Sequence, residues 1–189
     1  MGKCILIWHK QEGRYIPSAS EGGHADFAPQ TQQELDLAVF IKKTEQRTCN
    51  ISWEDVLSGH GIQRIYRFFC YKSGIACNTN GPHPDEIFKN RDKDENCHNT
   101  FVLYTIFYAR CAKNFALDAL ALGGVYIAGG IAAKNLPLFL ESSFMKEFVN
   151  CGKQQELLKQ IPIYVIADYN VSMHGAAAYM LLENMCDEQ

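Results

Sequence analysis

The feature that most constrains this chain is a long apolar stretch, Phe101 to Leu122. Three charged side chains interrupt it, Arg110, Lys113 and Asp118, which argues against a membrane span because charged groups deep in a bilayer are costly. Arg110, Asn114 and Asp118 recur at every fourth position and form a narrow polar stripe. A helix that is apolar almost all round packs on several sides, so the stretch predicts a buried helix.

Composition places the chain among ordinary globular proteins. It has 189 residues, of which 47% are hydrophobic, and a net charge of −3, which predicts one large domain. No basic face with interleaved aromatic residues is evident, so we expect no nucleic-acid partner. The first residues lack the cleavage-site pattern of a secretory signal, and we therefore expect a cytoplasmic protein without a membrane segment.

Eight cysteines are many for a chain of this length, but they form no Cys-x-x-Cys pair. Several lie in apolar stretches, where a free cysteine behaves as a small hydrophobic residue. Cys97 and His98 adjoin one another, yet no second pair stands at ligand spacing, so we predict no metal site. We expect reduced thiols at Cys4, Cys49, Cys70, Cys77, Cys97, Cys111, Cys151 and Cys186.

Strand and helix patterns alternate along the chain. Short apolar runs predict strands, whereas i, i+3, i+4 spacing and Ser or Thr caps predict helices. The patterns predict strands over residues 4–9, 15–18, 123–131 and 163–167, and helices after residue 31, after residue 52, just after Gly61 and over residues 83–88, 136–141, 144–150 and 172–182. This alternation predicts an α/β fold, with a mixed sheet covered by helices on both faces.

The densest polar signal is the segment 20–29, Ser-Glu-Gly-Gly-His-Ala-Asp-Phe-Ala-Pro. Glu21 is a charged acceptor and His24 a donor or acceptor, and the two glycines between them let the backbone approach a ligand. Such a group suits sugar hydroxyls, which need several directional hydrogen bonds. The alternative, which the residues alone leave open, is a glycine turn with surface charges.

A second polar element covers residues 54–61. Glu54 lies in the first turn of a predicted helix, where the helix dipole stabilises a carboxylate, and it is either a helix-start residue or a second acceptor for the same ligand. Gly59 and Gly61 precede the next helix, whose N–H groups can face a ligand. A simple helix-ending turn is the alternative.

The third element is residues 123–131, Gly-Gly-Val-Tyr-Ile-Ala-Gly-Gly-Ile, a buried strand bracketed by glycine pairs. Ligands of α/β sheets collect beyond the carboxyl ends of strands, and Gly129 and Gly130 stand at that end. Glycine there either lets a flat base approach or permits tight packing of strand against helix.

Together the three elements, in this order, closely resemble the bacterial-type glucokinase family from about Ile5 to Leu182. The resemblance implies the actin-like, ribonuclease-H-like ATPase fold, ATP with Mg as cofactor, glucose as substrate and a possible homodimer. It assigns Glu21, His24 and Glu54 to glucose hydroxyls. It assigns Gly129 and Gly130 to adenosine, and places Ser58 and Gly59 near the nucleotide.

The resemblance also has a limit. In the family, the phosphate loops and the catalytic aspartate precede the part that this chain matches. Asp26 lies in the sugar motif and Asp168 follows a late strand, so neither replaces that base. We therefore expect residues 1–189 to form a single C-terminal lobe, with a variable polar segment at 73–99, without the N-terminal lobe and inactive alone.

Two other interpretations remain beside a kinase. One is a non-catalytic fragment that binds sugar, nucleotide or a partner. The other is a sugar-responsive relative of the repressor/kinase type, which shares a Glu-x-Gly-His site. That type carries a closely spaced cysteine cluster after the histidine, whereas here Cys49 and Cys70 come next and lie far apart.

Overall fold

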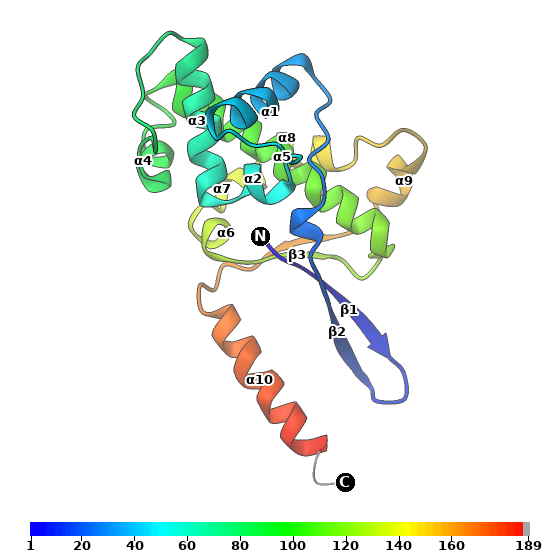
Figure 1. The fold of residues 1–189 in the computed structure, drawn as a ribbon. Coiled ribbons are helices and arrows are strands. Elements are labelled where there is room, and N and C mark those ends of the chain that lie inside the picture. The colour runs from blue at the N-terminus through cyan, green and yellow to red at the C-terminus, as the bar shows by residue number, and fades with distance from the viewer. Residues whose placement is uncertain (187–189) are drawn as a thin grey trace.

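The computed structural model describes residues 1–186 of the chain. Helices form most of the body and strands lie below it (Figure 1). In chain order the elements are β1 (Lys3–His9), β2 (Arg14–Ser20), the 3-10 helix η1 (Gly22–His24), α1 (Gln32–Thr44), α2 (Trp53–Leu57), α3 (Gly59–Lys72), α4 (Pro84–Lys89), α5 (Glu95–Ala119), β3 (Val125–Ile127), α6 (Gly130–Lys134), α7 (Pro137–Leu140), α8 (Ser142–Phe148), the 3-10 helix η2 (Gly152–Gln154), α9 (Gln155–Leu158), β4 (Ile163–Val165) and α10 (Val171–Cys186).

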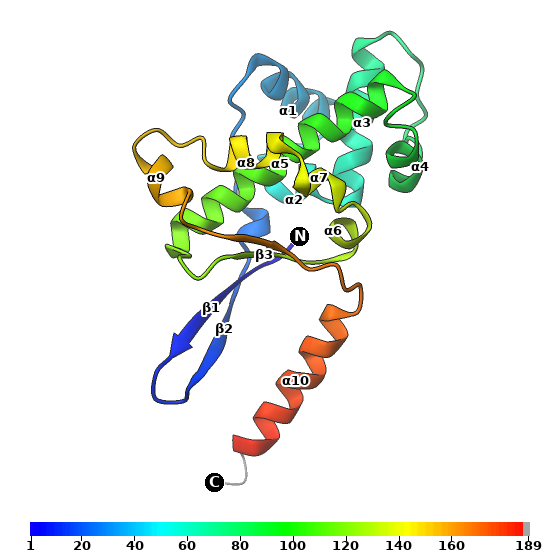
Figure 2. The same cartoon turned by 180° about the vertical axis from the view of Figure 1, so that it is seen from behind.

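The long apolar stretch forms α5, the central helix, which contacts α2, α3, α4, α7, α8 and α9 (Figures 1 and 2). Tyr104 and Phe107 are completely buried in the core. The helix begins earlier than its apolar residues predict because the Asp94 side chain accepts a 2.7 Å hydrogen bond from the backbone N–H of Cys97. It ends before Leu120, which adopts the left-handed conformation with φ of 45°.

Two cations of α5, Arg110 and Lys113, are buried against neighbouring elements, whereas Asp118 of the predicted polar stripe faces solvent. The guanidinium group of Arg110 donates to Glu34 of α1 at 2.7 Å and to Glu147 of α8 at 2.6 Å. Glu34 is only 2% exposed. Lys113 donates to the backbone oxygen of Asn150 at 2.9 Å. Buried charges require such partners, so these contacts hold two other helices against α5.

Both antiparallel and parallel strand pairs are present, but in the described residues they form two separate two-stranded sheets. β1 and β2 pair antiparallel, and β3 and β4 pair parallel. The parallel pair lies under the helical body, whereas the β1–β2 hairpin and α10 extend away from it (Figures 1 and 2). The predicted hairpin is confirmed, and the single mixed sheet is replaced in this chain by two pairs.

Apolar side chains on the hairpin and on α10 face solvent. On the hairpin, Trp8 and Tyr15 pack only edge to face, at 5.0 Å between ring centroids, and both are more than half exposed. On α10, Met173 and Met180 are about two thirds exposed. Exposed apolar side chains gathered on single elements in this way are typical of interaction sites.

In the part of the chain that the structure describes, no helix is long and apolar enough to cross a membrane.

Substitution of Arg110 tests the buried ion pairs. Arg110→Met should lower the free energy of unfolding by about 3–5 kcal/mol, measured in urea, because it leaves Glu34 and Glu147 without their cation. The control is Asp118→Asn, which removes a partner of Lys3 but is itself 62% exposed, and it should cost about 1 kcal/mol or less. Equal losses for the two variants would contradict the central role of Arg110.

Candidate functional site

A short antiparallel pairing of loop backbones places the sugar motif beside α2. The Phe27 N–H donates to the Ile51 carbonyl at 2.8 Å, and the Trp53 N–H donates to the Ala25 carbonyl at 3.0 Å. Beyond this pairing, η1 contacts α2. The pairing thus brings together two of the three predicted elements, residues 20–29 and 54–61, which lie far apart in the sequence.

Glu21 directly precedes η1 and His24 is its last residue, and both present their side chains to solvent. The Glu21 carboxylate and the His24 imidazole lie 3.9 Å apart, and the side chains are 91% and 64% exposed. The backbone N–H of His24 donates to the Glu21 carbonyl at 2.9 Å, which fixes their relative position. The pair therefore offers an acceptor and a switchable donor or acceptor on one surface, as the sequence predicts.

The two glycines of this motif are required by packing. A side chain at Gly23 would overlap the backbone carbonyl of Met1, and one at Gly22 would come within 2.6 Å of the Lys3 side chain. The beginning of the chain therefore crosses directly over η1, close to α2 and α6 (Figures 1 and 2).

Glu54 projects from the first turn of α2 toward the same place. One carboxylate oxygen is shielded from solvent and forms an ion pair with the α-ammonium group of Met1, while the whole side chain is 32% exposed. A glutamate in the first turn of a helix needs no such partner, so the helix-start role of Glu54 does not explain this ion pair. The structure thus places Glu54 beside η1 and gives it a cationic neighbour.

α3 begins at Gly59, three residues earlier than the sequence predicts. Ser58 is the N-cap, and its hydroxyl oxygen accepts a 3.1 Å hydrogen bond from the Gly61 N–H. A side chain at Gly61 would collide with the backbone of Val56. Gly61 is thus explained by the close packing of α2 on α3, whereas Gly59 lies at the surface with only Pro84 nearby.

The glycines after β3 stand at the carboxyl end of the parallel pair, where β4 also ends. Gly129 has φ of 114°, a conformation that favours glycine, and a side chain there would meet open space. Gly130 faces the ring of Tyr169, 3.2 Å from where a side-chain carbon would be. At the same edge His174 and Asp168 lie 3.2 Å apart.

Tyr169 was not predicted as a site residue. It follows β4 and is 66% exposed, yet its ring covers Gly130. Nothing in the local sequence pattern distinguishes it from other surface tyrosines, because the contact depends on the parallel pairing of β3 with β4. The structure thus adds an aromatic surface to the predicted glycine pair.

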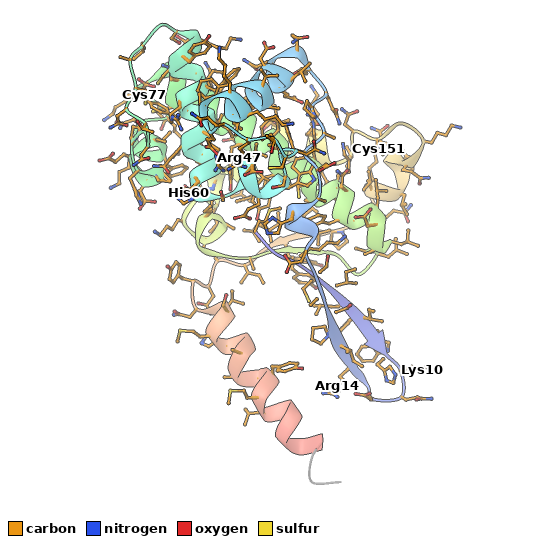
Figure 3. All side chains as sticks on the ribbon, viewed as in Figure 1. Lys10, Arg14, Arg47, His60, Cys77 and Cys151 are labelled. Carbon is orange, nitrogen blue, oxygen red and sulfur yellow. The ribbon has the colours of Figure 1, made fainter. Side chains whose placement is uncertain are left out.

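A charged network joins the segment after α1 to α2 and α3, and Figure 3 labels one of its members, Arg47. Arg47 contacts Asp55 at 2.5 Å and Glu45 at 2.6 Å, and Arg64 contacts Glu45 at 2.7 Å. Burial by itself raises the pKa of Asp55, but hydrogen bonds from Ser52 and Arg47 outweigh it and lower that pKa. Burial likewise acts against the ionised Glu45, and the adjacent guanidinium groups lower its pKa overall.

Two cavities lie elsewhere, between α3 and α4. Their volumes are about 370 Å³ and 320 Å³, and Tyr66, Pro82 and Glu86 line both. None of the predicted site residues lines either cavity. Within residues 1–186, no three His, Cys, Asp or Glu side chains are grouped so that they could hold a metal ion.

Comparisons with known proteins identify the class. A glucokinase from an Antarctic psychrotroph has a similar structure, with a TM-score of 0.79, 28% identity, and coverage of 94% of this chain and 53% of that one. A glucokinase from Balamuthia mandrillaris, in complex with glucose, shares the fold with a TM-score of 0.72 at 23% identity, over 85% of this chain and 45% of that one. The chain thus has the α/β fold of the actin-like ATPases.

The sequence comparisons narrow the class to a family. The model of the glucokinase family matches residues 1–183. The glucokinase of Nostoc punctiforme is 35% identical over 94% of this chain and 57% of its own length, and that of Synechocystis is 34% identical over 94% and 55%. The chain belongs to the glucokinase family, and it spans about half the length of the curated relatives it matches.

The charged network predicts how stability depends on pH. Asp55 and Glu45 have folded-state pKa values below their ordinary values of 3.8 and 4.5, so the unfolded chain binds more protons as the pH falls. Stability should hold above these ordinary values and decrease as the pH falls through and below them, measured by urea unfolding at several pH values. Arg47→Met should flatten this decrease.

The control for that variant is Arg67→Met, because the Arg67 guanidinium lies over the ring of Phe40, at 6.0 Å, rather than in the network. It should keep the acid-side decrease of the unmodified chain. If Arg47→Met loses as much stability at acid pH as the unmodified chain, other carboxyl groups cause the loss.

Proposed function

We propose that this chain is the sugar- and adenosine-binding lobe of an ATP-dependent glucokinase, which transfers the terminal phosphoryl group of ATP to the 6-hydroxyl of glucose as glycolysis begins. The observation that supports the proposal is the backbone pairing of residues 25–27 with residues 51–53, which brings η1 next to α2, the helix that carries Glu54. Membership of the glucokinase family supports it.

Glucose suits this group of side chains. Glu21 and Glu54 accept hydrogen bonds from sugar hydroxyls, and His24 donates or accepts one. One structural neighbour was solved with glucose bound, which supports a sugar as the ligand class.

The adenosine part of ATP would lie at the carboxyl end of β3. Gly129 leaves open space there, and Tyr169 offers an aromatic face beside Gly130. Ser58 and Gly59 at the start of α3 are proposed to lie near the nucleotide, since the Ser58 hydroxyl hydrogen is not used by the cap and remains a donor. Mg²⁺ would come with the phosphates of ATP, and we assign no residue to it.

Phosphoryl transfer of this type needs a carboxylate that accepts the proton of the attacking hydroxyl. We propose that this carboxylate belongs to a second lobe. Asp26 is bound by Asn50 at 3.3 Å, and Asp168 pairs with His174, so both are already engaged. The exposed apolar side chains of the hairpin and α10 fit a surface that a second lobe covers.

We further propose that the complete enzyme acts in the cytoplasm, where ATP is available, and that it forms a homodimer. The second statement depends on the family resemblance alone. A non-catalytic binding fragment is the competing function, and the absence of an assigned proton acceptor in residues 1–186 favours it for the isolated chain.

Loss of Glu21 tests the sugar site. Glu21→Ala should abolish measurable glucose binding in isothermal titration calorimetry without changing the urea midpoint, because the side chain is 91% exposed and packs on nothing in the core. Glu156→Ala is the matched control, since that glutamate is 78% exposed and its carboxylate pairs with Lys159 at the surface. Unchanged glucose affinity in Glu21→Ala would refute the assignment.

Gly129 tests the nucleotide side. Gly129→Val should weaken binding of a non-hydrolysable ATP analogue, because the added side chain enters the space that the nucleotide would use. It should also cost about 1–3 kcal/mol from backbone strain. Gly13→Val is the control: Gly13 also has positive φ, 62°, and open space, but it lies at the hairpin turn. Equal analogue affinities in both variants would exclude Gly129 from the site.

A further inference from the structure

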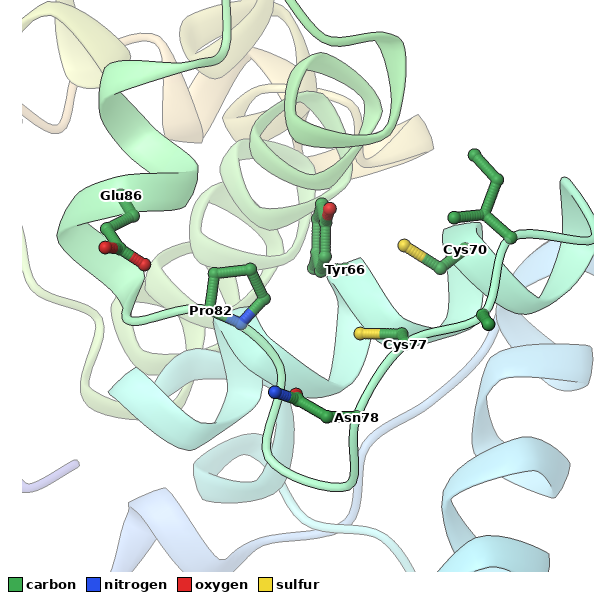
Figure 4. Close-up of a pocket in the computed structure, with 8 residues that line it drawn as sticks. Tyr66, Cys70, Cys77, Asn78, Pro82 and Glu86 are labelled. Carbon is green, nitrogen blue, oxygen red and sulfur yellow. The ribbon is translucent and has the colours of Figure 1, made fainter.

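A cavity between the end of α3 and the segment that follows it contains two cysteines (Figure 4). Its volume is about 370 Å³, and Tyr66, Cys70, Cys77, Pro82 and Glu86 are among its lining residues. None of these residues belongs to the proposed sugar or nucleotide site. What this cavity does is therefore a separate question from glucose phosphorylation.

The backbone returns sharply at the end of α3. The Ser73 N–H donates to the Phe69 carbonyl, and the Ile75 N–H donates to the Cys70 carbonyl at 2.9 Å. Gly74 makes this reversal possible, because it has φ of 68°, which favours glycine. The chain therefore comes back past Cys70 and reaches Cys77 on the same side of the helix.

The two thiols meet inside the cavity. Both side chains line the cavity, and, besides burial, the neighbouring Cys77 contributes to raising the pKa of Cys70. Figure 4 shows both sulfur atoms on the side of the cavity where Tyr66 lies. Cys70 is buried and Cys77 is exposed, so reagents in solution reach the second thiol first.

We propose that Cys70 and Cys77 are a reversible redox pair, which a small disulfide such as oxidised glutathione converts to an intramolecular disulfide. The Cys77 thiolate attacks one sulfur of the oxidant, and one glutathione thiolate leaves. Cys70 then loses its proton and attacks the Cys77 sulfur, and the second glutathione leaves as a thiol. Two protein thiols become one disulfide while one oxidised glutathione becomes two reduced molecules.

The different burial of Cys70 and Cys77 determines the order of the two steps. Burial raises the pKa of Cys70, so little thiolate exists there at neutral pH, whereas Cys77 is open to solvent. Attack by Cys77 therefore comes first, and Cys70 resolves the mixed disulfide because it is already adjacent. The reverse order would need the oxidant to enter the covered side of the cavity.

A third cysteine, Cys97 at the start of α5, lies near Cys70 but is a poorer partner. Burial and a hydrogen bond with Asp94 raise the pKa of Cys97 to about 12. Its thiolate is therefore rare at neutral pH, and the residue is only 4% exposed. This difference makes the Cys70–Cys77 link the specific product.

The disulfide would fix the segment between α3 and α4. That segment leads to Pro84, the first residue of α4, which lies against Gly59 at the other end of α3. Oxidation would thus join the end of α3 to the chain that packs beside its beginning. The redox pair itself does not depend on what binds near Gly59.

Tryptic mapping of the full chain tests the pair directly. Trypsin cuts after Arg67, Lys72 and Lys89, so Cys70 and Cys77 fall on different peptides and a link between them is visible by mass spectrometry. The folded protein is treated with oxidised glutathione, remaining thiols are alkylated in acid-quenched samples, and the digest is analysed with and without reductant. The expected result is a linked pair of peptides 68–72 and 73–89 that disappears on reduction.

Two variants make the outcome decisive. Cys77→Ser should abolish the linked pair and leave Cys70 alkylated, whereas Cys49→Ser, which removes another exposed thiol, should leave its yield unchanged. Far-ultraviolet circular dichroism before oxidation shows whether each variant is folded. The proposal is overturned if Cys77 stops at the mixed glutathione disulfide, if Cys70 links to Cys97, or if the folded chain gives no more linked pair than the chain in urea.

Discussion

The fold depends on one buried cation. Arg110, on the central helix α5, holds Glu34 of α1 and Glu147 of α8, and Glu34 in turn accepts a 2.6 Å hydrogen bond from the backbone N–H of Gln30. Desolvating three charges is costly, and only their mutual contacts offset it. This arrangement therefore permits few other packings, and it sets where the loop from β2 to α1, which carries the sugar motif, must run.

That loop then determines the site. Because Phe27 is buried in the core, packed edge to face with Trp53 and Phe107, the segment before it is held against the segment that begins α2. η1 and the first turn of α2 consequently meet. The exposed groups on them, Glu21 and His24, are positioned by apolar packing that lies behind them rather than by contacts of their own.

The sequence predicts the local elements well where caps and spacing are strong, as at Thr31, whose hydroxyl oxygen accepts from the Glu34 N–H. It misplaces helix starts where a polar side chain acts from outside the apolar run, as Asp94 does for α5. Local patterns do not predict that Glu54 lies near residues 20–29, because the pairing of residues 25–27 with residues 51–53 is non-local. Only the family resemblance predicts that they belong to one site. The position of Tyr169 over Gly130 has no local signal at all.

The glycines of the three motifs separate structural from ligand-facing roles. Gly23 and Gly61 lie against the backbone of Met1 and Val56, so packing alone accounts for the absence of a side chain. Gly129 has a positive φ and faces open space, so packing does not account for it. A conformation that costs about 1–3 kcal/mol for other residues is kept where something else benefits from it. At Gly129, the N-cap of α6, the turn from β3 into the helix uses this conformation and leaves the space beside it open.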